Sequence, residues 1–201
     1  MTLFPFFENI ENKMFLVVGA GKVAKGKIKR LLPFTNNITV IAEKVDIDGI
    51  NAIEKSFEPS DIFIGDYVIG ATDSHELNSE IALLCKKNGI PVNIVDDPDN
   101  CTFIFPSLIK RGDLTIGVTS AGKSPALSQH IRREIEKILP DDIEGVLDVM
   151  YQIRQRLKNT IDSQPVRSEV NKKVLAVLLE QGDIDEPTLE KIISECEENQ
   201  Q

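Results

Sequence analysis

Residues 15–24 read FLVVGAGKVA, and this segment carries the signals for a strand, a turn and a helix in direct succession. The apolar run from Phe15 to Val18 is typical of a strand that is buried on both faces of a parallel sheet. Beyond the glycines, apolar side chains recur at helical spacing until Pro33 ends the pattern. The segment therefore predicts a strand, a tight glycine turn and a helix.

The turn has the pattern G-x-G-x-x-A, formed by Gly19, Gly21 and Ala24. In such a turn the first glycine permits the bend, the second lets a pyrophosphate approach the backbone, and the alanine lets the helix pack closely on the strand. The start of the helix supplies free N–H groups and a partial positive charge. Because the pattern lies between a strand and a helix, it predicts a dinucleotide-binding site. The alternative is a glycine-rich turn without a ligand.

The candidate for recognition of the cofactor's ribose is Glu43, which follows the apolar run from Ile38 to Ala42. An acidic residue at the end of the second strand usually holds the adenosine ribose, so Glu43 favours NAD over NADP. Two alternatives stay open. Glu43 is a solvated side chain, or the adjacent Lys44 attracts the 2′-phosphate of NADP.

Two more short apolar runs, Tyr67 to Ala71 and Val92 to Val95, predict strands of the same parallel sheet. Between them, Ser74 is the expected N-cap of a helix that stops at Gly89. Strand and helix therefore alternate, which indicates βαβ units.

The pattern changes after Asp99. Strand-like runs at 102–109 and 114–118, joined by residues 110–113, predict an antiparallel hairpin. Ser124 and Pro125 then begin a helix that reaches about Leu139. Further helical patterns follow near 142–160, 168–181 and 187–198.

The charge of the chain is unevenly distributed. Of its 201 residues, 23 are Lys or Arg and 32 are Asp or Glu, which gives a formal charge of −9. Residues 141–201 hold seven basic and fourteen acidic side chains, so most of the excess negative charge lies in this segment. A protein that binds a nucleic-acid duplex normally shows a basic face, so nucleic acid is not an expected partner.

No apolar run approaches the roughly 18 residues of a membrane-spanning helix, and the opening residues lack the basic region of a signal peptide. We therefore expect a cytoplasmic protein without a membrane partner. The three cysteines are widely spaced and form no C-x-x-C, which favours reduced thiols. The two histidines, His75 and His130, are too few for a metal cluster, so no metal site is predicted.

Four more motifs follow the glycine turn in order: GATD at 70–73, VNIVD at 92–96, FIFPS at 103–107 and TSAGKSP at 119–125. Together with the turn, this series resembles the precorrin-2 dehydrogenase and sirohydrochlorin ferrochelatase family, which includes the amino-terminal module of siroheme synthase. The resemblance covers about residues 3–140, and residues 141–201 match only loosely. The chain departs from the family at Gly26, where a basic residue is usual, and at Ala121, where a glycine is usual.

The resemblance implies an α/β fold with three parts. Residues 1–110 are expected to form an NAD-binding, Rossmann-like parallel sheet, residues 111–140 a dimerisation segment, and residues 141–201 a small helical C-terminal domain. The implied protein is a homodimer that oxidises precorrin-2 to sirohydrochlorin with NAD+ in siroheme biosynthesis. Some relatives also insert Fe2+ into the product, and the sequence leaves open whether this chain does.

The glycine turn and the resemblance together give a set of expected cofactor contacts: Gly19, Gly21, Lys22, Val23, Glu43, Lys44 and Thr72. The family's functional aspartate corresponds to Asp96, at the carboxyl end of a predicted strand, where a carboxylate could accept a proton or hold pyrrole N–H groups. The alternative for Asp96 is a loop or capping role.

A second expected substrate contact is the loop with Thr119, Ser120 and Lys123, which could bind a carboxylate through hydroxyl and backbone donors. Helix capping explains the same residues equally well. Two other functions fit the chain as a whole. One is an NAD-dependent dehydrogenase of another small substrate, and the other is a non-catalytic NAD-sensing module.

Overall fold

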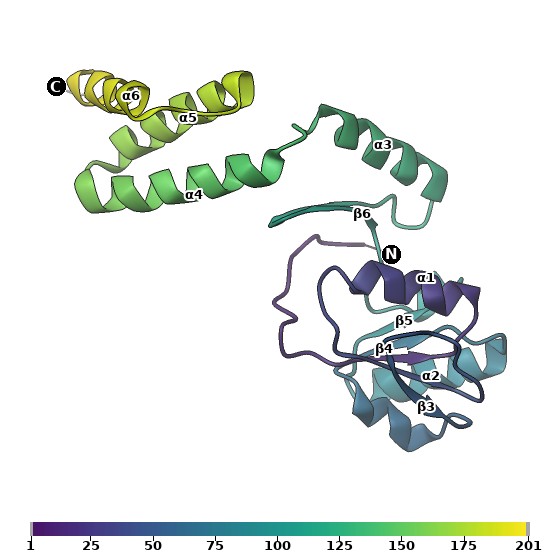
Figure 1. Cartoon of the computed structure of the whole chain (residues 1–201). Helices are drawn as coiled ribbons and strands as arrows, with labels where there is room; N and C mark the ends of the chain where they lie inside the picture. The colour runs from purple at the N-terminus through teal and green to yellow at the C-terminus, as the bar shows by residue number, and fades with distance from the viewer. Residues whose placement is uncertain (1, 200–201) are drawn as a thin grey trace. The chain divides into compact units, whose positions relative to one another are not determined.

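The computed structural model describes residues 2–199, which fold into two compact units. The sheet unit extends to Leu108 and also includes Val118–Gln129, and the helical unit comprises Ile109–Gly117 and the residues from His130 onward. Figure 1 shows the elements of both units. None of the helices within residues 2–199 is long and apolar enough to cross a membrane.

The sheet unit contains one five-stranded parallel sheet. Its strands are β1 (Phe15–Val18), β2 (Ile38–Ala42), β3 (Asn51–Glu54), β4 (Tyr67–Gly70) and β5 (Val92–Ile94), in the spatial order β3-β2-β1-β4-β5. The register pairs Val18 with both Ile41 and Gly70, and pairs Gly70 with Ile94. The carboxyl ends of neighbouring strands are therefore aligned along one edge. This arrangement confirms the predicted Rossmann-like class.

Helices cover both faces of the sheet because β1 alternates its apolar side chains between them. Phe15 and Val17 pack with the buried face of α1 (Lys22–Leu31), which lies on one side. Leu16 and Val18 pack on the other side, with α2 (His75–Lys87) and the short 3-10 helix η1 (Pro59–Ile64). Figure 1 shows α1 and α2 on opposite sides of the sheet.

The turn after β1 depends on Gly19. Its φ of +107° is a conformation that residues with a side chain rarely adopt. A Cβ at this position would lie 2.2 Å from the carbonyl oxygen of Ala71, in the segment that follows β4. Gly21 differs, because no atom lies within 4 Å of the place that its Cβ would take. Gly19 is therefore required by the fold, whereas Gly21 is not.

The predicted helix boundaries around α2 are confirmed. The Ser74 hydroxyl accepts a hydrogen bond from the backbone N–H of Leu77 at 3.1 Å, and Gly89 adopts a positive φ just beyond the C-cap. Ser124 accepts in the same way from Leu127 at the start of α3 (Pro125–Ile138).

One predicted strand is partly wrong. The hairpin consists of β6 (Ser107–Arg111) and β7 (Leu114–Val118), joined by Gly112 and Asp113, so residues 102–106 lie outside it. The segment 102–106 satisfies its polar groups differently. Thr102 bonds the backbone of Val92 through both its N–H and its hydroxyl, and the Phe103 carbonyl accepts from Asn93. Strand β3 and η1 have no counterpart in the sequence-based prediction.

The helical unit has a core of its own between α4 (Ile143–Thr160), α5 (Gln164–Gln181) and α6 (Glu186–Glu198). On α5, buried apolar residues recur every four positions from Val166 to Leu178. The predicted start of α5 near residue 168 is four residues late, because Pro165 lies in the first turn, where it has no need of an N–H donor.

We predict that the two glycines of the turn differ sharply in their effect on stability. Gly19→Ala should lower the free energy of unfolding by about 2–6 kcal/mol, because it combines backbone strain with a clash against the Ala71 carbonyl. Gly21→Ala should cost less than about 1 kcal/mol. Urea unfolding of both variants measures the difference, and equal losses would contradict the role given to Gly19.

Candidate functional site

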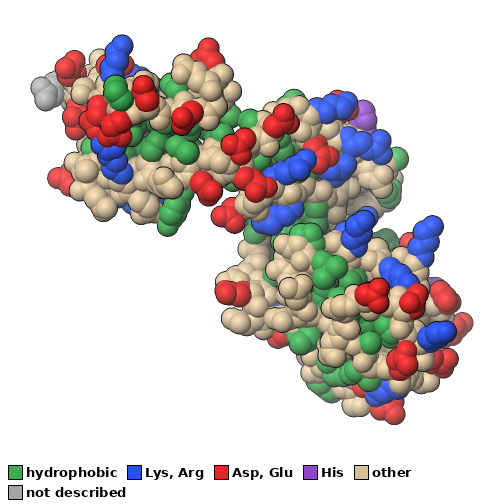
Figure 2. Space-filling model, viewed as in Figure 1, with side chains coloured by type: hydrophobic (Ala, Val, Ile, Leu, Met, Phe, Trp, Pro, Cys, Tyr) green, Lys and Arg blue, Asp and Glu red, His purple; other side chains and the backbone are tan. Residues whose placement is uncertain are grey.

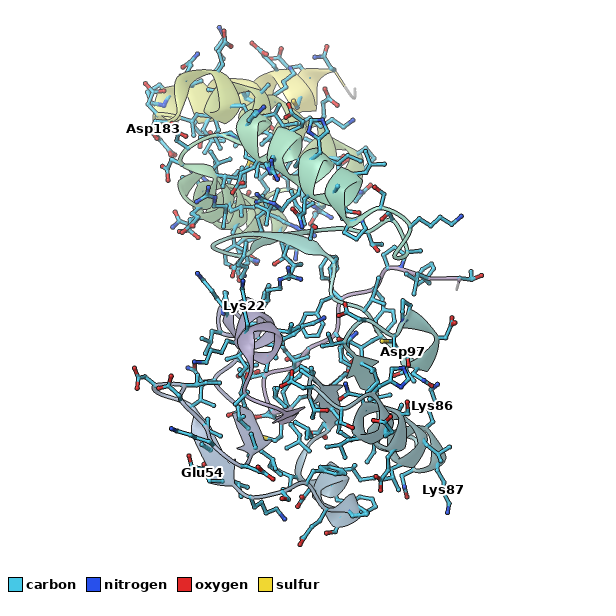
Figure 3. All side chains as sticks on the ribbon, turned by 90° about the vertical axis from the view of Figure 1, so that its right-hand side faces the viewer. Lys22, Glu54, Lys86, Lys87, Asp97 and Asp183 are labelled. Carbon is cyan, nitrogen blue, oxygen red and sulfur yellow. The ribbon has the colours of Figure 1, made fainter. Side chains whose placement is uncertain are left out.

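The aligned strand ends bring four loops to one edge of the sheet. Glu43 follows β2, the glycine turn follows β1, Thr72 follows β4 and Asp96 follows β5. Since the strand order is β2-β1-β4-β5, these segments lie along the edge in that same order. In Figure 3 the labelled residues Glu54, Lys22 and Asp97 come from three segments at this edge. Ligands of open α/β sheets bind at such an edge.

The start of α1 fits a pyrophosphate. Gly21 is the N-cap and has no side chain to bond the first N–H groups of the helix, and no acidic residue lies in the first turn. The space beside Gly21 that a Cβ would fill is open. Lys22 is exposed, and Val23 is an apolar residue that is 48% exposed at the helix start. Free donors, an open approach and a nearby cation are the features that hold a phosphate.

Glu43 and Lys44 are both exposed just beyond the end of β2. One Glu43 carboxylate oxygen accepts a hydrogen bond of 3.2 Å from the Ser56 hydroxyl, which leaves the other oxygen without a hydrogen bond among residues 2–199. The loop after β2 is held by Glu54, whose carboxylate accepts from the Val45 N–H at 3.0 Å. A carboxylate and an ammonium group thus belong to adjacent exposed residues just beyond the end of β2.

Thr72 is fixed by Asn78, the first buried polar residue of α2. The Asn78 amide oxygen accepts from the Thr72 N–H at 3.2 Å and from its hydroxyl at 2.9 Å, and the amide nitrogen donates to the Thr72 carbonyl at 3.0 Å. The loop after β4 is therefore rigid where it meets the glycine turn.

Asp96 is exposed and has a φ of +58°, which is unusual for a residue with a side chain. Its carboxylate makes no hydrogen bond to any residue between 2 and 199. The capping role belongs to its neighbour Asp97, whose carboxylate accepts from the Asn100 backbone at 3.2 Å and from its side-chain amide at 2.7 Å. These hydrogen bonds lower the pKa of Asp97. Asp96 is thus left free to contact a ligand.

Lys27 is a partly buried cation to which the glycine turn does not point. It extends from α1 to the middle of β5, where its ammonium group donates to the amide oxygen of Asn93 at 3.0 Å and lies 4.4 Å from the centre of the Phe105 ring. Burial lowers the pKa of Lys27, with a further contribution from the positive charge of Arg30, whereas Asp96 acts in the opposite direction. A partly buried cation therefore lies within electrostatic reach of the Asp96 carboxylate.

Two signals in the sequence point to the pair formed by Lys27 and Asn93. On α1 the buried residues are Ala24, Ile28 and Leu31, and Lys27 falls at the remaining position of that stripe. Asn93 is the polar residue in an otherwise apolar strand, and it is buried. Each polar group satisfies the other, as buried polar groups require.

The loop before α3 is held by its own hydroxyl groups. Thr119 accepts from the Ala121 N–H at 3.1 Å, and Ser120 accepts from the Ser124 N–H and from the Ser128 hydroxyl, both at 3.0 Å. Ala121 has a φ of +53°, which explains why a glycine suits this position.

This loop also lies near the segment that follows Asp96. A Cβ at Gly122 would be 4.0 Å from the Pro98 ring, so the two segments are neighbours. Lys123 is exposed in the same loop. Within residues 2–199 no group of three or more His, Cys, Asp or Glu side chains is placed to hold a metal ion.

The comparisons with known proteins agree with this geometry. A family model described as "NAD(P)-binding" matches residues 6–107, and a second, described as "Sirohaem biosynthesis protein central", matches residues 111–138. The chain is 39% identical over 166 residues to the siroheme synthase of Ruthia magnifica, and 32% identical over 176 residues to that of Nitrosomonas europaea. These matches cover 79% and 83% of this chain, but 35% and 37% of the relatives. The chain thus spans about a third of the length of these curated relatives.

Among solved structures, the chain is similar to SirC, a precorrin-2 dehydrogenase, with a TM-score of 0.74. The match covers 98% of this chain and 100% of SirC, at 18% sequence identity. At this identity the likeness establishes the fold.

We predict that Lys27 makes stability depend on pH in the alkaline range. Its pKa is lowered in the folded state, so between that lowered value and 10.5 the unfolded chain holds more protons. The free energy of unfolding should therefore rise with pH in this window, as the cost of burying the charge is removed. Urea unfolding at pH 7 and pH 9.5 measures this dependence.

Lys27→Met should remove this pH-dependent contribution, and Lys29→Met, an exposed position on the same helix, should preserve it. A pH dependence that is the same in wild type and Lys27→Met would contradict the prediction.

Proposed function

The chain belongs to the family of NAD(P)-binding precorrin-2 dehydrogenases and siroheme synthase amino-terminal modules, and on this premise we propose that it oxidises precorrin-2 to sirohydrochlorin. In this reaction a hydride passes from precorrin-2 to NAD+, and a proton is released. We assign cofactor binding to residues 1–110, dimerisation to residues 111–140, and leave residues 141–201 as a helical domain.

The observation that carries the proposal is the order of groups along the sheet edge. Four groups follow one another at the ends of β2, β1, β4 and β5. They are a carboxylate for the ribose, free N–H groups for the pyrophosphate, a threonine held by hydrogen bonds, and a carboxylate that has no hydrogen bond within residues 2–199. A dinucleotide laid along this edge with its adenosine at Glu43 would direct its nicotinamide toward Thr72 and Asp96. When bound, the nicotinamide supplies the hydride acceptor.

Asp96 is the group that we assign to the substrate. Loss of a hydride leaves positive charge on the tetrapyrrole, and a carboxylate without competing hydrogen bonds can stabilise that charge and accept the released proton. Lys27, held by Asn93, places a positive charge within electrostatic reach of Asp96. Thr119, Ser120 and Lys123 lie in the loop that neighbours Pro98, where their donors suit a substrate carboxylate.

We assign NAD, rather than NADP, as the cofactor. Glu43 keeps a carboxylate oxygen for the ribose hydroxyls, and its negative charge opposes a 2′-phosphate. Lys44 is the residue that would favour NADP, so the balance between these two side chains sets the preference.

We propose that two copies associate through the segment that includes α3. Leu127, Ile131 and Ile138 are 52%, 39% and 79% exposed, and with Ile135 they form one apolar stripe along this helix. Of the α3 side chains, Ser128 is the buried one. A hairpin and an amphipathic helix with little burial in the single chain are suited to pairing with a second copy.

The test of catalysis is substitution of Asp96. Asp96→Ala should leave the affinity for NAD+ nearly unchanged and lower the rate of sirohydrochlorin formation by about 10²- to 10⁴-fold. Asp96→Asn separates proton acceptance from positioning of the substrate, because asparagine keeps the volume of the side chain but cannot take a proton. Gly21→Val, which should fold but not bind NAD+, is the control for cofactor loss.

The reaction is followed by absorbance of NADH and of sirohydrochlorin. Normal turnover in both Asp96 variants would show that Asp96 is a structural residue and would defeat the catalytic role proposed for it. No turnover of precorrin-2 by the wild type would favour a dehydrogenase of another substrate or an NAD-sensing module.

The cofactor preference is tested at Glu43. Glu43→Ala should raise the KM for NAD+ by about 10- to 100-fold, through loss of charge-assisted hydrogen bonds to the ribose, and should lower the KM for NADP+. Lys44→Ala is the matched control and should leave the KM for NAD+ within about twofold. An unchanged ratio of the two KM values in Glu43→Ala would refute the assignment of NAD.

Association is tested on α3. The wild type should have a mass near twice 22.4 kDa in light scattering at micromolar concentration. Ile131→Glu should give the mass of a single chain, because it places a charge in the apolar stripe. Gln129→Glu adds the same charge on the opposite side of α3 and should leave the pair intact. A wild type with the mass of one chain would defeat the proposal.

A further inference from the structure

The helical unit contains an open cavity at its surface that the proposed reaction does not use. It has a volume of about 650 Å³ and is lined by side chains of α4 and α5, and no residue of the parallel sheet contributes to it. Cavities of this size are in the range of small-molecule sites. On each helix the lining residues recur at helical spacing, so the cavity lies between two continuous faces.

The charge of the lining is opposite to that of its surroundings. Residues 141–201 contain twice as many acidic as basic side chains, yet the lining has four cations and no acidic residue: Arg154, Lys158, Arg167 and Lys172. Five of the acidic side chains lie on α6, and Figure 2 shows acidic side chains over this helix. Other cations of residues 141–201 have acidic partners: Arg156 pairs with Glu186 and Glu190, and Lys173 pairs with Glu195. Four cations of residues 141–201 have no ion pair within residues 2–199, and three of them, Arg154, Lys158 and Arg167, line the cavity, whereas Lys191 lies outside it.

Arg167 is fixed in position by hydrogen bonds to uncharged backbone carbonyl groups. One of its guanidinium nitrogens donates to the backbone carbonyls of Ile161 and Asp162, at 2.6 and 2.8 Å. Arg154 and Lys158 are exposed and have no ion pair or hydrogen bond within residues 2–199, and Lys172 has only a 3.4 Å contact with Glu169. One held guanidinium and two unpaired cations are an arrangement suited to more than one anionic group.

The remaining lining gives the cavity an apolar surface and one unsatisfied polar atom. Tyr151 is 65% exposed and lines the cavity together with Leu147, Met150 and Leu175. The amide nitrogen of Asn171 donates to the Arg167 carbonyl at 2.6 Å, whereas its buried amide oxygen has no partner among residues 2–199. A buried acceptor without a donor costs free energy, and an N–H or O–H group of a ligand would remove that cost.

We propose that the face formed by α4 and α5 binds an organic polyanion, a molecule with two or more carboxylate or phosphate groups on a flat apolar body that also carries a hydrogen-bond donor. The cations bind the anionic groups, Tyr151 and its apolar neighbours contact the body, and Asn171 accepts from the donor. Polycarboxylate tetrapyrroles and nucleotides share this chemistry. The site stands on residues of the helical unit alone, so it does not depend on the proposed reaction.

The test uses the full chain and two probes, uroporphyrin for polycarboxylates and ADP for nucleotides, measured by isothermal titration calorimetry. Arg154→Gln/Lys158→Gln removes two exposed cations of the cavity that have no intramolecular partner. Lys173→Gln/Lys191→Gln is the matched control, because it makes the same change in net charge at positions outside the lining. Thermal unfolding followed by circular dichroism verifies that both variants are folded.

The proposal expects the cavity variant to bind at least one probe about tenfold or more weakly than the wild type, with the control within about twofold. A loss confined to uroporphyrin identifies a polycarboxylate ligand, and a loss confined to ADP identifies a nucleotide. Equal weakening in both variants would show an effect of net charge and would overturn the site, as would wild-type affinity of the cavity variant for both probes. A change of mass in light scattering caused by the cavity variant would assign this face to a second copy and would also overturn it.

Discussion

The close approach of two backbone segments at the end of β1 is the constraint on which the rest of the sheet unit depends. The Ala71 carbonyl oxygen occupies the place where a Cβ would be at position 19, so the chain must pass through glycine there. This approach lets the turn after β1 lie directly against the segment after β4. It also points the first N–H groups of α1 toward the edge where the parallel strands end. The cofactor site and the close packing of α1 on the sheet are consequences of one steric requirement.

Hydrogen bonds between distant segments provide a second set of constraints in the sheet unit. Lys27 on α1 and Asn93 on β5 are far apart in the sequence, and their hydrogen bond joins the helix that begins the cofactor site to the strand that ends at Asp96. Asn93 also donates to the Phe103 carbonyl, and Cys101 accepts from the Ile94 N–H, so the segment after β5 is tied back onto the strand. These bonds hold Asp97 and its neighbours in a fixed loop, from which the carboxylate of Asp96 remains free.

The helical unit follows a different principle. Its stability comes from apolar stripes on three helices that bury one another, and this core contains no residue of the sheet. The outer faces of the helices therefore carry the charged side chains, and the two signs lie in different places. Acidic side chains concentrate on α6, whereas cations without an ion pair line the cavity between α4 and α5. The cations that line the cavity are therefore available to an anionic ligand.

The sequence by itself determined the class of fold and the strand–turn–helix segment to which we assign the cofactor. Glycine spacing, short apolar runs and the caps Ser74 and Ser124 are local signals, and each acts through sterics or hydrogen bonds within a few residues. Local signals also placed Glu43, Thr72 and Asp96 at strand ends.

Only the tertiary structure decided which of these groups remain available to a ligand. Three outcomes are long-range: Asp97 caps a turn and Asp96 does not, Lys27 is partly buried against Asn93, and Thr102 and Phe103 hydrogen-bond to β5 instead of pairing in the hairpin. They depend on contacts between segments that are distant in the chain, and the free energy of such contacts is set by burial and by the pairing of polar groups, which no window of sequence contains.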